Sequence, residues 1–194
     1  MTLIQVIALV VLALFYIAYF TKMILQHSKG VQTDQIGKGN KPRKILVIEI
    51  LMKIATYIIV VVEIVSIVLN LQICQSPYAW IGIGIAFLGV IIFVTAMATM
   101  KDSWRAGISD KDKTELVTTG IYRISRNPAF LGFDLMYIGV LVAFFNFVHL
   151  ACVIYAVLML HLQILNEEKF LTETFGIKYI EYKRKTGRYF TLKL

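Results

Sequence analysis

Hydrophobic residues along the chain fall into five long stretches separated by polar or very short segments. As an α-helix, the first stretch is roughly 36 Å long, enough to cross a hydrocarbon core of about 30 Å. The last two stretches follow each other almost without a loop, which indicates a tight helical hairpin. The pattern predicts an all-α integral membrane bundle of five transmembrane helices, with spans at about 2–25, 45–69, 78–100, 128–148 and 149–165.

The segments between these stretches alternate in charge. Three are basic and two are uncharged, the basic ones lying at 26–44, 101–127 and 166–194 and the uncharged ones at 70–79 and 145–149. Because Lys and Arg are retained on the cytoplasmic side during insertion, the alternation places the N-terminus outside and the C-terminus in the cytoplasm. It also predicts cytoplasmic helical segments after the third and fifth spans, and polar chemistry at that face.

Composition agrees with one membrane domain over residues 1–194. Charged residues make up 16% of the chain, whereas soluble domains have about 25%. The net charge of +8 is explained by basic loops near anionic headgroups, so a nucleic acid is not expected as a partner. Cys74 and Cys152 have no nearby His, which predicts no metal site. The long apolar start lacks the basic beginning and cleavage site of a signal peptide.

A few polar residues and glycines interrupt the spans. Glu49 and Lys53 form an i,i+4 pair near the start of the second span. Glu63 and Asp134 lie deeper, where an acid faces protein rather than lipid, and the sequence leaves open whether they serve packing or a substrate pocket. In the third span, glycines 82, 84 and 89 predict close approach by a neighbouring helix.

Polar residues gather in two cytoplasmic segments, at 104–130 and 163–190, each joined directly to a membrane helix. A site between them would open to both cytosol and lipid. In the first segment, Gly120 permits a chain reversal, Tyr122 supplies an amphipathic ring, and Arg126 precedes a helix start that favours an anion. The alternative is that Arg123 and Arg126 only anchor the helix to headgroups.

In the second segment, Glu167 and Glu168 are adjacent on a helix and point about 100° apart, so only one need face a site. A carboxylate there could bind a cationic group such as an ammonium. Gly176 is expected to kink or end this helix. After it, an apolar stripe that includes Tyr179 and Tyr182 predicts packing onto the membrane domain.

Taken in order, these motifs resemble the isoprenylcysteine carboxyl methyltransferase family and are similar to the wider group of membrane phospholipid methyltransferases. The resemblance covers roughly the last 90 residues, and the cofactor region is expected at about 104–194. The compact chain looks like a prokaryotic or archaeal member. The matching residues are Gly120, Tyr122, Arg126, Pro128, Gly132, Glu167, Glu168, Phe175, Gly176, Tyr179 and Tyr182, together with Trp104, Arg105, Gly107 and Ile108.

The resemblance implies S-adenosylmethionine as methyl donor, with Arg126 and Glu167 as the expected catalytic residues. Gln163 stands where relatives have an Arg that holds the substrate carboxylate, and it is the expected substrate-binding residue. Asn127 replaces a common His, and Phe130 a common Tyr. The implied cofactor-binding residues are Thr114, Glu115, Leu116, Val117, Tyr122, Asn127, Pro128, Ala129, Phe130 and Glu167.

The sequence thus predicts methyl transfer to a lipid-embedded acceptor that enters from the bilayer, with the carboxylate of an isoprenylated cysteine first. A phospholipid or other small lipid amine or carboxylate is the alternative acceptor. An amine would need a base, for which Glu63, Asp134 and His161 are candidates. An NADPH-dependent membrane reductase of the sterol reductase type is a second alternative. A transporter is a third, although its expected acids near the midplane are represented only by Glu63.

Overall fold

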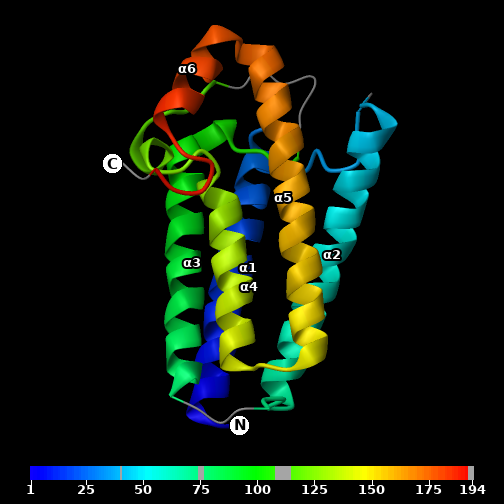
Figure 1. Ribbon diagram of the computed structural model, residues 1–194, viewed down its shortest axis with the longest axis vertical. Coiled ribbons are helices and arrows are strands. Elements are labelled where there is room, and N and C mark those ends of the chain that lie inside the picture. The colour runs from blue at the N-terminus through cyan, green and yellow to red at the C-terminus, as the bar shows by residue number, and fades with distance from the viewer. Residues whose placement is uncertain (40, 74–76, 108–114, 192–194) are drawn as a thin grey trace.

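The computed structural model describes residues 1–39, 41–73, 77–107 and 115–191, and within these ranges its regular structure is helical apart from one isolated β-bridge. This confirms the all-α prediction. Long helices run up and down along one axis, and the shorter elements gather at the upper end in Figure 1. The elements are α1 (Leu3–Ser28), α2 (Arg43–Val68), α3 (Tyr78–Met100), η1 (Lys101–Ser103), η2 (Gly120–Arg123), α4 (Pro128–Ala143), α5 (Phe147–Phe175) and α6 (Ile177–Lys185).

Among the described residues, four helices are long and apolar enough to cross a membrane: α1, α2, α3 and α5. The predicted span at 78–100 coincides with α3, and α1 and α2 lie within a few residues of their predicted positions. With 16 residues, α4 is shorter. At 1.5 Å per residue it is about 24 Å long, short of the thickness of a hydrocarbon core.

The predicted boundary between the last two spans, at residues 148 and 149, is wrong. α4 ends at Ala143 and α5 already begins at Phe147. Asn146 causes the break, because its backbone is extended and its side-chain oxygen accepts a hydrogen bond from the His149 N–H at 2.9 Å. Such an N-cap satisfies an otherwise free backbone donor at the helix start. α5 then continues past the predicted end at residue 165, to Phe175.

Glycines bring α3 and α4 into close contact along their length. A Cβ at Gly89 would lie 2.7 Å from the Gly132 carbonyl oxygen, and one at Gly82 would lie 2.5 Å from that of Gly139. The predicted close approach is therefore confirmed for these two residues of α3. It is wrong for Gly84, where a Cβ would meet nothing within 4 Å. Small residues facing each other in this way let membrane helices associate through backbone contact.

An aromatic cluster joins α1 to this pair. Phe15 stacks on Phe93 with ring centroids 4.4 Å apart, and Phe93 meets Phe133 edge to face at 5.0 Å. Trp104 packs edge to face against Tyr19 at 5.7 Å. Offset and edge-to-face ring pairs add stability beyond the area they bury. The cluster fixes α1 against α3 and α4 just below the polar end of the bundle.

The segment between α1 and α2 is tied to the chain after α3. The Gln35 N–H donates to the Ala106 carbonyl at 2.8 Å, and the Ala106 N–H donates to the Thr33 carbonyl at 3.0 Å. Gln26, near the end of α1, donates to the Trp104 carbonyl at 3.1 Å. These bonds hold the two connections together over the upper end of the bundle.

Glu49 and Lys53 of α2 have partners in the same connection. Lys41 lies 2.8 Å from Glu49, and both side chains are buried. Lys53 lies 3.3 Å from Asp34. Glu63 is fully buried, and neither of its carboxylate oxygens has a hydrogen-bond partner among the described residues. Glu63 and Asp134, the two acids predicted to face protein, are both buried. The paired charged residues of α2, Glu49 and Lys53, lie in its first half, nearer the upper end of the bundle.

Candidate active site

The Gly120–Pro128 segment forms a tight platform above α3. Gly120 adopts a φ of +57°, which side chains other than glycine rarely reach, and it opens the short helix η2. This confirms the predicted chain reversal. Tyr122 is buried, and its carbonyl accepts a hydrogen bond of 2.6 Å from the Tyr182 hydroxyl of α6. Burial raises the pKa of Tyr122 well above its usual range, and the charge of Glu167 adds to the effect. The tyrosine hydroxyl and that carboxylate are therefore within electrostatic range of each other.

Gly176 allows α6 to fold back onto this platform. It has a φ of +54° and separates α5 from α6, as the sequence predicts. Tyr179 and Tyr182 on α6 are buried, and their rings meet edge to face at 6.0 Å. The stripe predicted to pack onto the membrane domain therefore does so. It carries the end of the chain toward η2, where the Thr191 N–H donates to the Ile124 carbonyl at 2.8 Å.

Glu168 binds these segments together. Its Oε1 accepts hydrogen bonds from Arg126 Nη2 at 2.8 Å and from Asn127 Nδ2 at 3.2 Å, and its Oε2 accepts from Arg188 Nη2 at 3.0 Å. Arg126 also donates to the backbone carbonyls of Lys183 and Thr186. Because the side chains of Arg126 and Glu168 are almost fully buried, this cluster is a structural junction of η2, α5 and the tail.

Glu167 points to the other side of α5 and lines a large cavity. Its Oε1 accepts a hydrogen bond of 3.1 Å from Gln163 Nε2. Gln163 is fully buried, yet its Oε1 has no partner among the described residues, and the same holds for Nδ2 of Asn166. Buried polar groups are nearly always paired, so the unpaired Oε1 of Gln163, whose Nε2 donates to the cavity residue Glu167, indicates a place for a polar ligand. The two adjacent acids therefore differ, since Glu168 joins segments and Glu167 faces the cavity.

The cavity has a volume of about 820 Å³ and runs between α1 and α2 toward the core helices. Its polar end is formed by charged residues from four segments, namely Asp34, Lys53, Arg105 and Glu167. Away from that end the wall is apolar, with Leu9, Leu12, Phe20, Val60, Ile64 and Val68 among its residues. The shape suits a molecule with a polar head and a long apolar tail.

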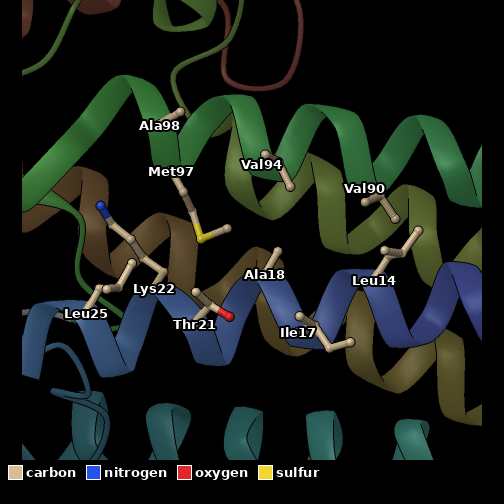
Figure 2. A pocket seen from close by; sticks show the side chains of 10 residues that line it. All are labelled: Leu14, Ile17, Ala18, Thr21, Lys22, Leu25, Val90, Val94, Met97 and Ala98. Atoms are coloured by element: carbon tan, nitrogen blue, oxygen red, sulfur yellow. The ribbon is translucent and has the colours of Figure 1, made fainter.

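A second hollow lies between α1 and α3 and has a volume of about 450 Å³ (Figure 2). Its walls are aliphatic except for Thr21 and Lys22 at one side. Residues predicted to form the site do not line it. Among its lining residues, this groove offers no polar side chain for chemistry apart from these two.

The predicted site residues do not all reach the cavity. Ala129, Phe130 and Glu167 line it. Tyr122 is close to Glu167, and Gln163 is bonded to it. Asn127 and Arg126 instead serve the Glu168 junction.

The remaining predicted residues lie before η2, at 114–117, or shortly after it, at Pro128. Pro128 is buried in the first turn of α4. Glu115 is exposed, Leu116 and Val117 are half-buried, and Thr114 lies outside the described residues.

Sequence reasoning missed several residues. Arg188 and Asn166 were not singled out, because neither lies in a motif. Lys53 was assigned to a local pair with Glu49, and its place on the cavity wall depends on how α2 faces α1. Trp104 and Arg105 were noticed only for their resemblance to relatives, and the structure places both on the cavity wall.

The fold and the cavity together define an integral membrane protein whose charged pocket adjoins an apolar trough. Residues 80–173 match the model of the isoprenylcysteine carboxyl methyltransferase (ICMT) family. Over this segment, 94 of the 194 residues, the chain is similar to that family. The matched residues comprise most of α3, the motif around η2, all of α4 and nearly all of α5.

The chain is also similar to named methyltransferases. It is 34% identical over 110 residues to the protein-S-isoprenylcysteine O-methyltransferase of Saccharomyces cerevisiae. The aligned residues cover 55% of this chain and 46% of the yeast protein. It is 33% identical over 106 residues to protein-S-isoprenylcysteine O-methyltransferase A of Arabidopsis thaliana, or 52% and 53% of the two chains. The chain thus spans about half the length of the curated relatives it matches.

Proposed function

We propose that this protein transfers a methyl group from S-adenosylmethionine to the carboxylate of an isoprenylated cysteine at the cytoplasmic face of a membrane. The observation that carries the proposal is the cavity that joins Glu167 to an apolar trough between α1 and α2. The family match and the names of the relatives support the reaction type.

The unpaired groups beside Glu167 fit the amino-acid part of the methyl donor. An ammonium group needs acceptors, which Glu167 and Oε1 of Gln163 offer. Tyr122 and Phe130 add aromatic and apolar surface close by. S-adenosylmethionine, when bound, supplies a methyl group on a positively charged sulfur. As the oxygen–carbon bond forms, the carbon–sulfur bond breaks and sulfur keeps the electron pair.

A carboxylate acceptor requires no general base, because it is already ionised at neutral pH. The protein's contribution is therefore to position the acceptor and to exclude water. Opposite charges on donor and acceptor are neutralised as the bond forms, so a dry, apolar pocket favours the reaction. The aromatic side chains of Phe93, Trp104 and Phe133 on the cavity wall provide that surrounding. Orientation of the two reactants supplies much of the remaining acceleration.

In this proposal, Arg126 is a positioning residue. Four of its N–H donors are directed at Glu168 and at two backbone carbonyls, so its guanidinium is engaged within the protein. It fixes η2 and α6 against α5 instead of contacting the reacting atoms. We therefore propose a positioning role for Arg126 in place of the expected catalytic one, and we propose that Glu167 contacts the cofactor as expected.

We further propose five crossings, with the N-terminus outside. α4 is short but packs backbone to backbone along α3, and its ends lie at the levels of η2 and of the turn before α5. The basic segments and the proposed site then face the cytoplasm. Cysteine substitutions at Thr2 and Lys185, labelled from either side of sealed vesicles with an impermeant maleimide, test this topology. Labelling of both from the same side contradicts it.

The function is tested with detergent-purified protein. Calorimetry should show binding of S-adenosylhomocysteine, and the protein should transfer labelled methyl groups to N-acetyl-S-farnesylcysteine in preference to phosphatidylethanolamine. Binding of NADPH without binding of S-adenosylhomocysteine would overturn the reaction type. Label in phosphatidylethanolamine alone would overturn the acceptor while leaving the methyl donor in place.

A further inference from the structure

The polar end of the cavity poses an electrostatic problem for a carboxylate acceptor. Two of its four charged side chains, Asp34 and Glu167, are negative. Gln163 is neutral, and its Nε2 already donates a hydrogen bond to Glu167. A carboxylate that leaves water for such a place is strongly destabilised unless a cation and hydrogen bonds compensate it. A cation on the cavity wall must therefore receive the acceptor.

Two cations line this end, Lys53 from α2 and Arg105 from the connection after α3. Nη1 of Arg105 donates to the Asp102 carbonyl at 2.6 Å and to the Trp104 carbonyl at 2.9 Å, so its own connection holds the side chain. Lys53 has an ammonium group with three donors, and its described partner is Asp34 at 3.3 Å. Donors therefore remain on Lys53 for a ligand.

Asp34 has partners other than Lys53. The same carboxylate oxygen lies 3.3 Å from Lys38, and the other oxygen accepts a hydrogen bond from the Ile36 N–H at 3.1 Å. Asp34 would therefore stay paired if Lys53 turned toward a ligand. Because both contacts to lysine are long and partly exposed, exchanging one of them costs little.

The place of Lys53 along α2 matches a molecule with a carboxylate head and an apolar tail. Glu49 lies one turn before Lys53, or about 6 Å nearer the polar end, and is within electrostatic reach of Glu167. One turn and more beyond Lys53, the cavity wall continues with Tyr57, Val60 and Ile64. Lys53 thus stands at the junction of the charged pocket and the apolar trough.

We propose that Lys53 binds the carboxylate of the acceptor and holds it beside the methyl donor, with the acceptor's tail in the trough between α1 and α2. The proposal rests on the proposed function and extends it by naming the residue that selects a carboxylate. A structural alternative exists, in which the lysine stem lies along apolar surface and the ammonium reaches the headgroups. The two alternatives predict different effects of replacing Lys53 on the binding of a ligand that lacks a carboxylate.

The test measures binding of N-acetyl-S-farnesylcysteine, and of its uncharged carboxamide, to protein saturated with S-adenosylhomocysteine. Lys53→Met should weaken binding of the acid by about tenfold or more, because a charged hydrogen bond is lost. Binding of the carboxamide and of S-adenosylhomocysteine should not change. Lys53→Arg should restore most of the affinity for the acid. Lys44→Met is the matched control, since Lys44 is an exposed cation near the start of α2 and does not line the cavity.

The double variant Lys53→Met with Asp34→Asn repeats the test without an unpaired aspartate. Equal loss of acid and carboxamide binding would overturn the proposal in favour of a packing role, and unchanged acid binding in Lys53→Met would overturn it outright. Both results leave the proposed function standing if the wild type methylates the acid. A wild type that binds S-adenosylhomocysteine but neither binds nor methylates the acid overturns the proposed acceptor, and the role of Lys53 with it.

Discussion

The α3–α4 pair and the α1–α2 pair are built on opposite principles. α3 and α4 touch backbone to backbone at Gly82, Gly89, Gly132 and Gly139. α1 and α2 are joined near one end by the bond from Gln5 to the Ile67 carbonyl, and they form opposite walls of the large cavity.

The family match covers the first pair and α5, and it begins after α1 and α2. Under the proposed function, this difference assigns binding of the methyl donor to α4 and α5, and selection of the acceptor to α1 and α2.

The largest effect is expected at the buried junction. Glu168→Ala leaves Arg126 and Arg188 without their carboxylate and should cost about 3–5 kcal/mol, the usual result of removing one partner of a buried ion pair. Thermal unfolding in detergent measures it. The control is Glu173→Ala, whose partner Lys169 is exposed, and where about 0–1 kcal/mol is expected. Similar melting temperatures for the two variants would contradict the junction.

The next effect concerns the glycine contact. Gly89→Ala adds a methyl group 2.7 Å from a carbonyl oxygen of α4 and should destabilise the bundle by about 1–3 kcal/mol through overpacking. Gly84→Ala, on the same helix with open space around it, should not destabilise. The same unfolding assay applies. Equal loss of stability in both variants would contradict the contact at Gly89, because alanine is the better helix former and helix propensity alone would stabilise both.

Glu167 provides the sharpest contrast with its neighbour. Glu167→Ala should weaken binding of S-adenosylhomocysteine by well over tenfold, or more than about 1.4 kcal/mol, while leaving the melting temperature nearly unchanged. Calorimetry and unfolding on the same preparation separate the two quantities. Unchanged affinity would reject the assignment of this acid to the cofactor, and a large loss of stability would place it with Glu168.

A bulky side chain in the trough tests the role of the apolar wall formed by α2. Val60→Trp places a large ring in the cavity and should raise KM for N-acetyl-S-farnesylcysteine about tenfold while S-adenosylhomocysteine binds as before. Val65→Trp, on a part of α2 that does not line the cavity, is the control. Steady-state kinetics with labelled donor gives the numbers. An equal rise in both variants would show that the trough does not hold the tail.

The smallest effect is expected at Asp34. Burial alone would raise the pKa of Asp34, but the Ile36 N–H and the charges of Lys53 and Lys38 outweigh it and lower the pKa below its usual 3.8. Its contribution is therefore present above that value and is lost as pH falls through the lowered pKa. Asp34→Asn should cost less than about 1 kcal/mol at pH 7, and the difference from wild type should shrink toward pH 3. A difference independent of pH would point to lost hydrogen bonding instead.

The sequence predicted the helices well because apolar length is a local property. The predicted boundary between the fourth and fifth spans was wrong because Phe144 and Phe145 keep the turn before α5 apolar. A hydrophobicity pattern cannot show a turn made of phenylalanine. Only the capping geometry of Asn146 reveals it. The motif residues around Gly120 and Gly176 were found because left-handed backbone positions favour glycine.

The site was harder to predict, because its roles depend on contacts between distant segments. Helix geometry shows that Glu167 and Glu168 diverge, but it cannot tell which of them meets Arg126, more than forty positions earlier in the chain. The position of Lys53 on the cavity wall likewise depends on how α2 is rotated against α1. Motifs therefore located the region, and tertiary packing assigned the individual residues.

The junction around Glu168 also sets the rotational phase of α5. Each residue turns an α-helix by about 100°, so the arginines that fasten one carboxylate also aim the next one. Inserting or deleting a single residue between the membrane part of α5 and this pair would turn both carboxylates by about 100° relative to the membrane part, so the junction at Glu168 and the packing of α5 could not both be kept. The spacing along α5 is thus a requirement in its own right, beyond the identity of either acid.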